Sequence, residues 1–231
     1  MNPLFALDRA ETEGKIPKAI AKRVRGRAKY LVGAVKRVEK ASELSYPPYY
    51  VEPVLPLAQS RGEAGQLGVL YARVIPTVAA AGAGGLSILV QFTAALVAFG
   101  AKGTLEAVAG HEFTHYLDLV RKLSRMSVVS DERAATLFES SFADTERTVK
   151  MKSIFKDRAL IKLVERKFPL GLVDDKLNAL VEKRWIGKGL PVRMVAPEEN
   201  VVRLGMGSVL SSSFDPGVIA RISSLEEKVR S

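Results

Sequence analysis

The chain has 231 residues, 47% of them hydrophobic, and a formal net charge of +10 at pH 7. This composition is sufficient for a buried core and excludes a largely disordered protein. The chain contains no cysteine, which excludes disulfide frameworks, thiol catalysis and thiolate metal sites. No N-terminal segment has the basic, apolar and small-residue pattern of a secretory signal, so we expect a cytoplasmic protein.

The positive charge is concentrated near the N-terminus. From Lys15 to Lys40 there are ten basic residues and one acidic residue, Glu39. Apolar residues recur in this segment at helical spacing, which predicts an amphipathic helix that Gly26 and Gly33 interrupt weakly. The apolar positions are Ile16, Ile20, Val24, Leu31, Val35 and Val38.

This basic helix has two interpretations. Its apolar stripe, which includes Arg27, predicts a helix packed on the domain with a solvated basic face. Alternatively, residues 15–40 form a binding surface for nucleic acid or an anionic membrane. After the helix, Pro47 and Pro48 predict the start of an extended segment.

Residues 74–101 contain no formal charge, and their number alone would allow a membrane span. Pro76 and three glycines between positions 82 and 85 interrupt the stretch. We therefore favour two strands, VLYARVIPTV and LSILVQF, joined by a glycine-rich turn and followed by a short helix, TAALVAF. A membrane span is the less favoured alternative.

A long helix is predicted next, with Thr104 as its N-cap and Leu123 near its end. It carries the only two histidines of the chain, His111 and His115. A separation of four residues rotates a helix by about 400°, so both imidazoles leave the same face one turn apart. The two rings are expected to be close enough to share one small cation.

The segment HEFTH, residues 111–115, resembles the H-E-x-x-H motif of the zincin metallopeptidases. The resemblance covers the motif and its strand-then-helix setting. It implies an α+β, zincin-like fold in which a small sheet precedes the active-site helix, an antiparallel helix follows it, and additional helices complete the domain. It also implies Zn²⁺ on His111 and His115, with Glu112 as the general base that activates a zinc-bound water.

A catalytic zinc ion needs three protein ligands and one open position. Because the chain has no third histidine and no cysteine, the third ligand must be a carboxylate, as in the gluzincin arrangement. A returning helix predicted from Ser130 to Phe155 would present Glu139 and Glu146 to the histidine helix. Glu139 is the preferred ligand, and Glu146 and Glu132 are alternatives.

Other polar residues have less specific roles. Asp118 lies on the helix face of the histidines and is interpreted either as an ion-paired residue or as an acid that orients a ligand. Donors of suitable chemistry for a developing oxyanion are Tyr71, Tyr116, Arg121 and Arg158.

We divide the chain into a basic amphipathic helix at 1–44 and a zincin-like metallopeptidase domain at 45–231. A C-terminal support region begins near 156, with helices predicted at LIKLVERKF, LVDDKLNALVEKRW and DPGVIARISSLEEKVR. The predicted function is zinc-dependent hydrolysis of a peptide or protein substrate. The alternative is a non-catalytic, metal-stabilised protein that binds nucleic acid or anionic membrane through residues 15–40.

Overall fold

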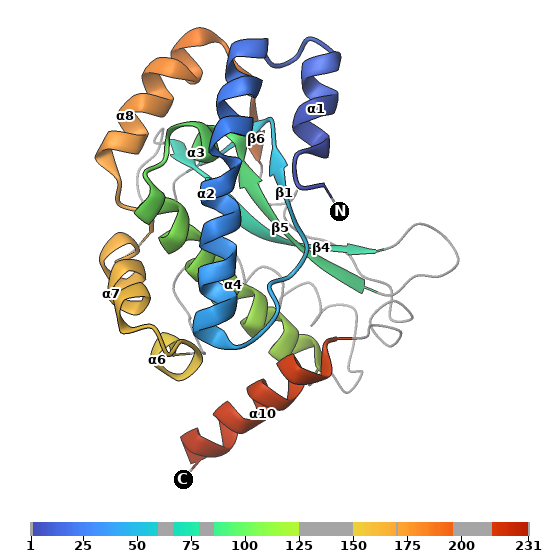
Figure 1. The fold of residues 1–231 in the computed structure, drawn as a ribbon, viewed down its shortest axis with the longest axis vertical. Helices are drawn as coiled ribbons and strands as arrows, with labels where there is room; N and C mark the ends of the chain where they lie inside the picture. Colours follow the sequence, from blue (N-terminus) through green and yellow to red (C-terminus); the bar gives the residue numbers. More distant parts are fainter. Residues whose placement is uncertain are drawn as a thin grey trace.

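A computed structural model describes residues 2–59, 67–78, 86–124, 150–169, 171–195 and 214–230, and Figure 1 shows their arrangement. These residues form an α+β protein with eight α-helices and two small mixed sheets. The first sheet has the order β1-β5-β4. Its strands are β1 (Tyr49–Glu52), β5 (Leu86–Thr93) and β4 (Ala72–Val78).

The predicted pair of strands before the histidine helix is confirmed. β4 and β5 pair antiparallel, with Val74 opposite Val90, and β1 adds to β5 in parallel. Pro76 lies in β4, which is an edge strand, where a residue without an N–H group is tolerated. The next segment is α3 (Ala94–Phe99), whose N-cap Thr93 accepts a hydrogen bond from the Leu96 amide.

The second sheet was not predicted. It has the order β3-β2-β6 and joins strands from both halves of the chain. β2 pairs antiparallel with β3 and parallel with β6. Its strands are β3 (Leu67–Val69), β2 (Leu55–Gln59) and β6 (Val192–Val195).

The prediction of one continuous strand over VLYARVIPTV is wrong. The backbone changes sheets between Leu70 and Tyr71. The Leu70 amide donates to Pro56 in the second sheet, whereas the Tyr71 carbonyl accepts from Thr93 in the first. The segment is therefore the end of one strand and the start of another.

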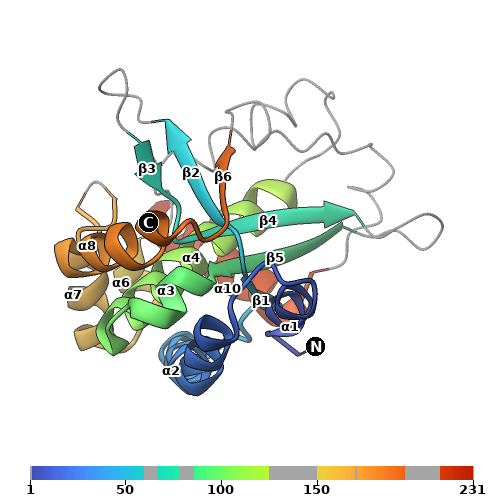
Figure 2. The ribbon, with the colours of Figure 1, turned by 90° about the horizontal axis from the view of Figure 1, so that it is seen from above.

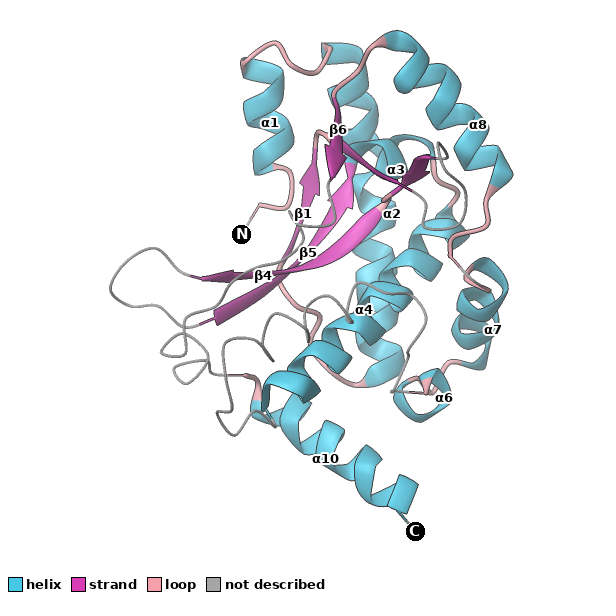
Figure 3. Cartoon of the chain, turned by 180° about the vertical axis from the view of Figure 1, so that it is seen from behind, coloured by secondary structure: helices cyan, strands magenta, loops and turns pink. Residues whose placement is uncertain are grey.

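Two long helices, α2 (Lys18–Ser42) and α4 (Lys102–Ser124), pack against each other on one face of the first sheet. Figure 1 shows α2 in front of the strands, and Figure 3 shows the strands in front of α2. The remaining helices are α1 (Phe5–Thr12), α6 (Met151–Ile154), α7 (Arg158–Lys167), α8 (Asp175–Arg184) and α10 (Pro216–Arg230), with a 3₁₀ turn at Ile186–Lys188.

The apolar stripe of the basic segment is buried against the rest of the protein. Val24, Leu31 and Val38 of α2 belong to the same core as α4 and the first sheet. The stripe tolerates Arg27 because its guanidinium donates to the carbonyls of Val97 and Gly100, which lie near the end of α3. The predicted interruption of this helix is wrong, because α2 is continuous.

The described residues of the uncharged stretch 74–101 lie mainly in β4, β5 and α3. None of the helices in the described ranges has the length and apolar character needed to cross a membrane. The predicted helices of the C-terminal region are confirmed as α7, α8 and α10.

Candidate metal centre

The helix that carries the histidines begins earlier than expected. α4 starts at Lys102, so Thr104 lies inside its first turn and is not the predicted N-cap. Its buried hydroxyl donates to the Asp174 carboxylate at 2.5 Å. Asp174 also caps α8 by accepting from the Leu177 amide. The Thr104 hydroxyl therefore links the start of α4 to the start of α8.

Gly110 allows another helix to approach α4 directly before the first histidine. A Cβ atom at this position would lie 3.0 Å from the Cγ2 of Val164 on α7, which is too close without a shift of the neighbour. The close packing of α7 against α4 brings Phe168, the residue after α7, onto the ring of His111. The two rings stack with centroids 3.8 Å apart and an interplanar angle of 10°.

His111 and His115 direct their Nε2 atoms toward each other at a separation of 3.0 Å. Their ring planes are nearly perpendicular, at 81°. Two Zn–N bonds of about 2.0–2.1 Å at a tetrahedral angle would place the nitrogen atoms about 3.3 Å apart. The pair therefore fits two adjacent positions of a zinc coordination sphere with a displacement of a few tenths of an ångström.

The two histidines differ in exposure. His111 is 3% exposed and lies beneath Phe168, whereas His115 is half-buried. A ligand that reaches the pair from solvent therefore meets His115 first. The stacked Phe168 holds the His111 ring in one orientation and shields it from water.

Glu112 is also buried, at 6% exposure, in the middle of α4. A carboxylate is rarely buried unless other groups stabilise it. Its charge acts on Tyr46, whose pKa is raised well above its usual value first by burial and then by Glu112. The Tyr46 hydroxyl donates to the Ala109 carbonyl at 3.0 Å, which fixes this ring beside α4.

The remaining candidates have contacts of their own. Asp118 is buried, with its Oδ1 3.9 Å from the Nε of Arg121, an arrangement that agrees with the ion-paired interpretation. The Tyr71 hydroxyl donates to Asn178 at 2.8 Å and so links the residue before β4 to α8. Burial, together with the charge of Asp215, raises the pKa of Tyr116 to about 12.

Arg158 is the first residue of α7 and is exposed. The candidate donors are Tyr71, Tyr116, Arg121 and Arg158. Their described contacts do not assign any of the four to a substrate. They remain candidates for oxyanion stabilisation on their chemistry alone.

The third ligand is not placed. Glu132, Glu139 and Glu146 all lie outside the described residues. Within the ranges that the structure describes, no group of three or more histidine, aspartate and glutamate side chains is positioned to hold a metal ion. The structure therefore brings together His111 and His115 and leaves the third ligand as a prediction.

The end of the returning helix differs from the prediction. A continuous helix was expected up to Phe155, but the backbone of Lys150 is extended, and α6 begins only at Met151. Phe155 is extended as well and packs against Phe113 of α4.

Comparison of the chain with models of known protein families, with curated proteins and with solved structures gave no significant match. The sequence analysis did not identify Phe168 or Tyr46 as residues of the site. No local pattern marks either of them, because each reaches α4 from a distant segment of the chain.

Proposed function

We propose that the chain is a zinc-dependent metallopeptidase with a zincin-like fold of the gluzincin type, acting on a peptide or protein substrate in the cytoplasm. The observation that supports this proposal most strongly is the histidine pair, with Nε2 atoms 3.0 Å apart on successive turns of α4. Glu112 lies between the two histidines in the sequence, where the zincin motif has its general base.

A purely structural hydrogen bond between the two rings is the competing explanation. It requires one neutral imidazole with a proton on Nε2 and the other with a lone pair there. A metal ion uses both lone pairs and needs no such asymmetry. Glu112 is buried directly after His111, at the position of the motif where hydrolysis requires a carboxylate.

The chain's own residues have distinct roles in this proposal. His111 and His115 would hold the zinc ion, with Glu139 as the proposed third ligand and Glu146 or Glu132 as alternatives. When bound, zinc supplies Lewis acidity that polarises the scissile carbonyl and makes water more acidic. Glu112 accepts a proton from the attacking water and transfers it to the leaving amine.

Cleavage of unfolded proteins and of a varied peptide panel tests the proposal. We expect the purified protein to contain about one equivalent of zinc, since the chain has one histidine pair. A zinc chelator should abolish cleavage, its non-chelating isomer should have no effect, and added zinc should restore the rate. A zinc-loaded protein that cleaves none of these substrates would favour the non-catalytic alternative.

A further inference from the structure

The exposed side of α2 carries a straight row of lysines. Successive members are four or seven residues apart, so at about 100° per residue they all lie within about 40° of one another on the helix surface. All members of this lysine row are exposed, and the buried residues of α2 lie on the opposite side of the helix. The lysine row consists of Lys18, Lys22, Lys29, Lys36 and Lys40.

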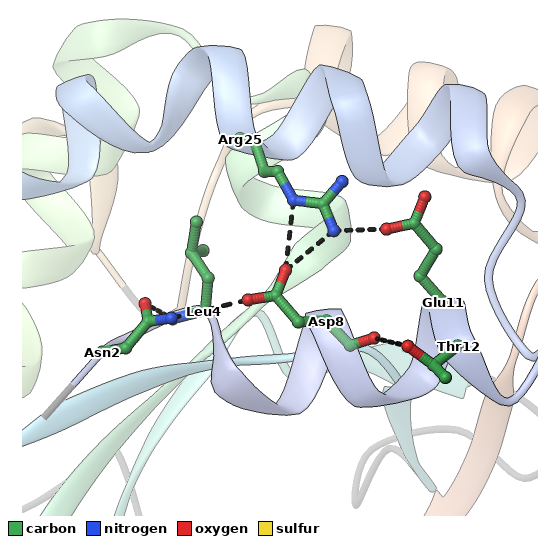
Figure 4. Close-up of polar contacts among 6 residues, drawn as sticks. All are labelled: Asn2, Leu4, Asp8, Glu11, Thr12 and Arg25. Carbon is green, nitrogen blue, oxygen red and sulfur yellow. Dashed lines mark hydrogen bonds and ion pairs between the residues drawn. The ribbon is translucent and has the colours of Figure 1, made fainter.

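The arginines of the same helix have a different role. Arg23 donates to the Ala98 carbonyl at 2.8 Å, and Arg37 bridges Glu106 and Asp157. Arg25 is held by two carboxylates of α1, as Figure 4 shows. Together with Arg27, these arginines fix α2 to the rest of the fold, whereas the lysines are directed to solvent.

Among the residues that the structure describes, no carboxylate lies within ion-pair distance of the five ammonium groups of the lysine row. The acidic residue nearest to the row in the sequence, Glu39, accepts a hydrogen bond from the Tyr46 amide instead. Figures 1 and 2 show α2 as an outer layer of the molecule, with no other described element over its outer side.

The surface beside the lysine row has little bulk. Small residues lie three positions before the three central lysines of the row, with Ala19, Gly26 and Gly33 preceding Lys22, Lys29 and Lys36. A Cβ atom at either glycine would meet no described atom within 4 Å, so the packing of the fold does not require glycine there. A long ligand can therefore lie against the helix backbone next to the ammonium groups.

A nucleic acid fits this surface better than a membrane. Lys40 lies 22 positions after Lys18, a rise of about 33 Å at 1.5 Å per residue, which matches about ten base pairs of duplex. Helices that bind in the membrane interface insert large apolar side chains beside their basic residues. The large hydrophobic residues exposed in the described structure, such as Phe5 and Met194, are not on α2.

We propose that the lysine row binds the phosphate backbone of a nucleic acid without sequence preference. Each ammonium group would neutralise a phosphate and release a counterion, so binding is strongly dependent on salt. This surface is formed by residues that the proposed peptidase chemistry does not use. Nucleic-acid binding to the lysine row therefore does not depend on peptidase activity.

Fluorescence anisotropy with a labelled DNA duplex of about 30 base pairs, about three times the span of the row, tests this proposal on the full chain. The variant Lys22→Gln/Lys29→Gln/Lys36→Gln removes the centre of the row. The matched control Lys162→Gln/Lys176→Gln/Lys183→Gln removes the same charge from exposed positions on α7 and α8. Circular dichroism and zinc content should be unchanged in both variants.

We expect the slope of log K against log salt to become shallower by about 2.7 in the row variant, or about 0.9 for each lost contact. The slope for the control should differ from that of the parent by no more than about 0.9, the change expected for one phosphate contact. Equal DNA binding by the row variant and the control would overturn the proposal. Binding to vesicles that contain phosphatidylserine, without binding to DNA, would overturn it in favour of a membrane surface.

Discussion

The Nε2 atoms of His111 and His115 lie 3.0 Å apart on successive turns of α4. If this pair holds zinc, His115→Ala should lose the bound metal, because one imidazole cannot replace a chelating pair. His115 is only half-buried, so this variant should remain folded. Tyr116→Phe, one residue further along α4, is the control and should retain the zinc content of the parent. Metal analysis after dialysis provides the measurement, and equal zinc in both variants would mean that the metal is bound elsewhere.

Phe168 should affect zinc binding through its contact with His111. Phe168→Leu removes a stacked ring whose centroid is 3.8 Å from that of His111, and such aromatic pairs contribute about 0.5–1.5 kcal/mol. Zinc affinity should therefore fall by up to about tenfold. Phe155→Leu is the matched control, because Phe155 contacts Phe113 but no histidine ring. Competition with a fluorescent chelator gives both affinities, and an equal loss in the two variants would indicate a general effect of core packing.

Glu139 is expected to be the third zinc ligand. Glu139→Ala should lower zinc affinity more than Asp144→Ala, because in the returning helix predicted from the sequence, at about 100° per residue, only Glu139 of these two would face the histidine helix. Loss of zinc in Glu146→Ala, with zinc retained in Glu139→Ala, would assign the ligand to Glu146. Metal affinity of the three variants, measured by chelator competition, distinguishes these results.

The helical glycines should respond to alanine in opposite directions. Gly110→Ala should destabilise the protein by about 1–3 kcal/mol, because its Cβ would press on Val164 at 3.0 Å. Gly26→Ala and Gly33→Ala should each stabilise it by about 0.5–1 kcal/mol, since their Cβ atoms would meet no described atom. Urea denaturation measures all three free energies of unfolding. A stabilising Gly110→Ala would mean that α7 does not pack this closely on α4.

The parts of the fold that could be predicted depend on local patterns. Periodicity predicted the helices that contain Leu31, His111 and Leu160, and β-branched residues predicted the β4–β5 pair. The second sheet could not be predicted, because β2 and β6 are distant in the sequence and their parallel register depends on tertiary packing. The same reason explains why the predicted continuous strand VLYARVIPTV is wrong at Leu70, where the backbone changes from one sheet to the other.

The candidate site was predictable to a similar extent. The spacing of His111 and His115 predicted that both rings leave one face of a helix, and the structure confirms this arrangement. The stacked Phe168 and the neighbouring Tyr46 could not be predicted, because both contacts are made between segments far apart in the sequence. Arg27 shows a related effect, since carbonyl acceptors on α3 allow a basic residue within an apolar stripe.

Replacement of Glu112 by glutamine tests the proposed peptidase most directly. Glutamine has nearly the same size and helix propensity as glutamate, so the fold and the zinc content should remain those of the parent. It cannot accept a proton from the attacking water, and loss of a positioned general base costs about 10²- to 10⁴-fold in rate. Glu165→Gln, at an exposed position on α7, is the control and should cleave as fast as the parent. We predict that zinc-loaded Glu112→Gln shows cleavage reduced by at least about 10²-fold; cleavage at the parental rate by zinc-loaded Glu112→Gln would contradict the proposed mechanism.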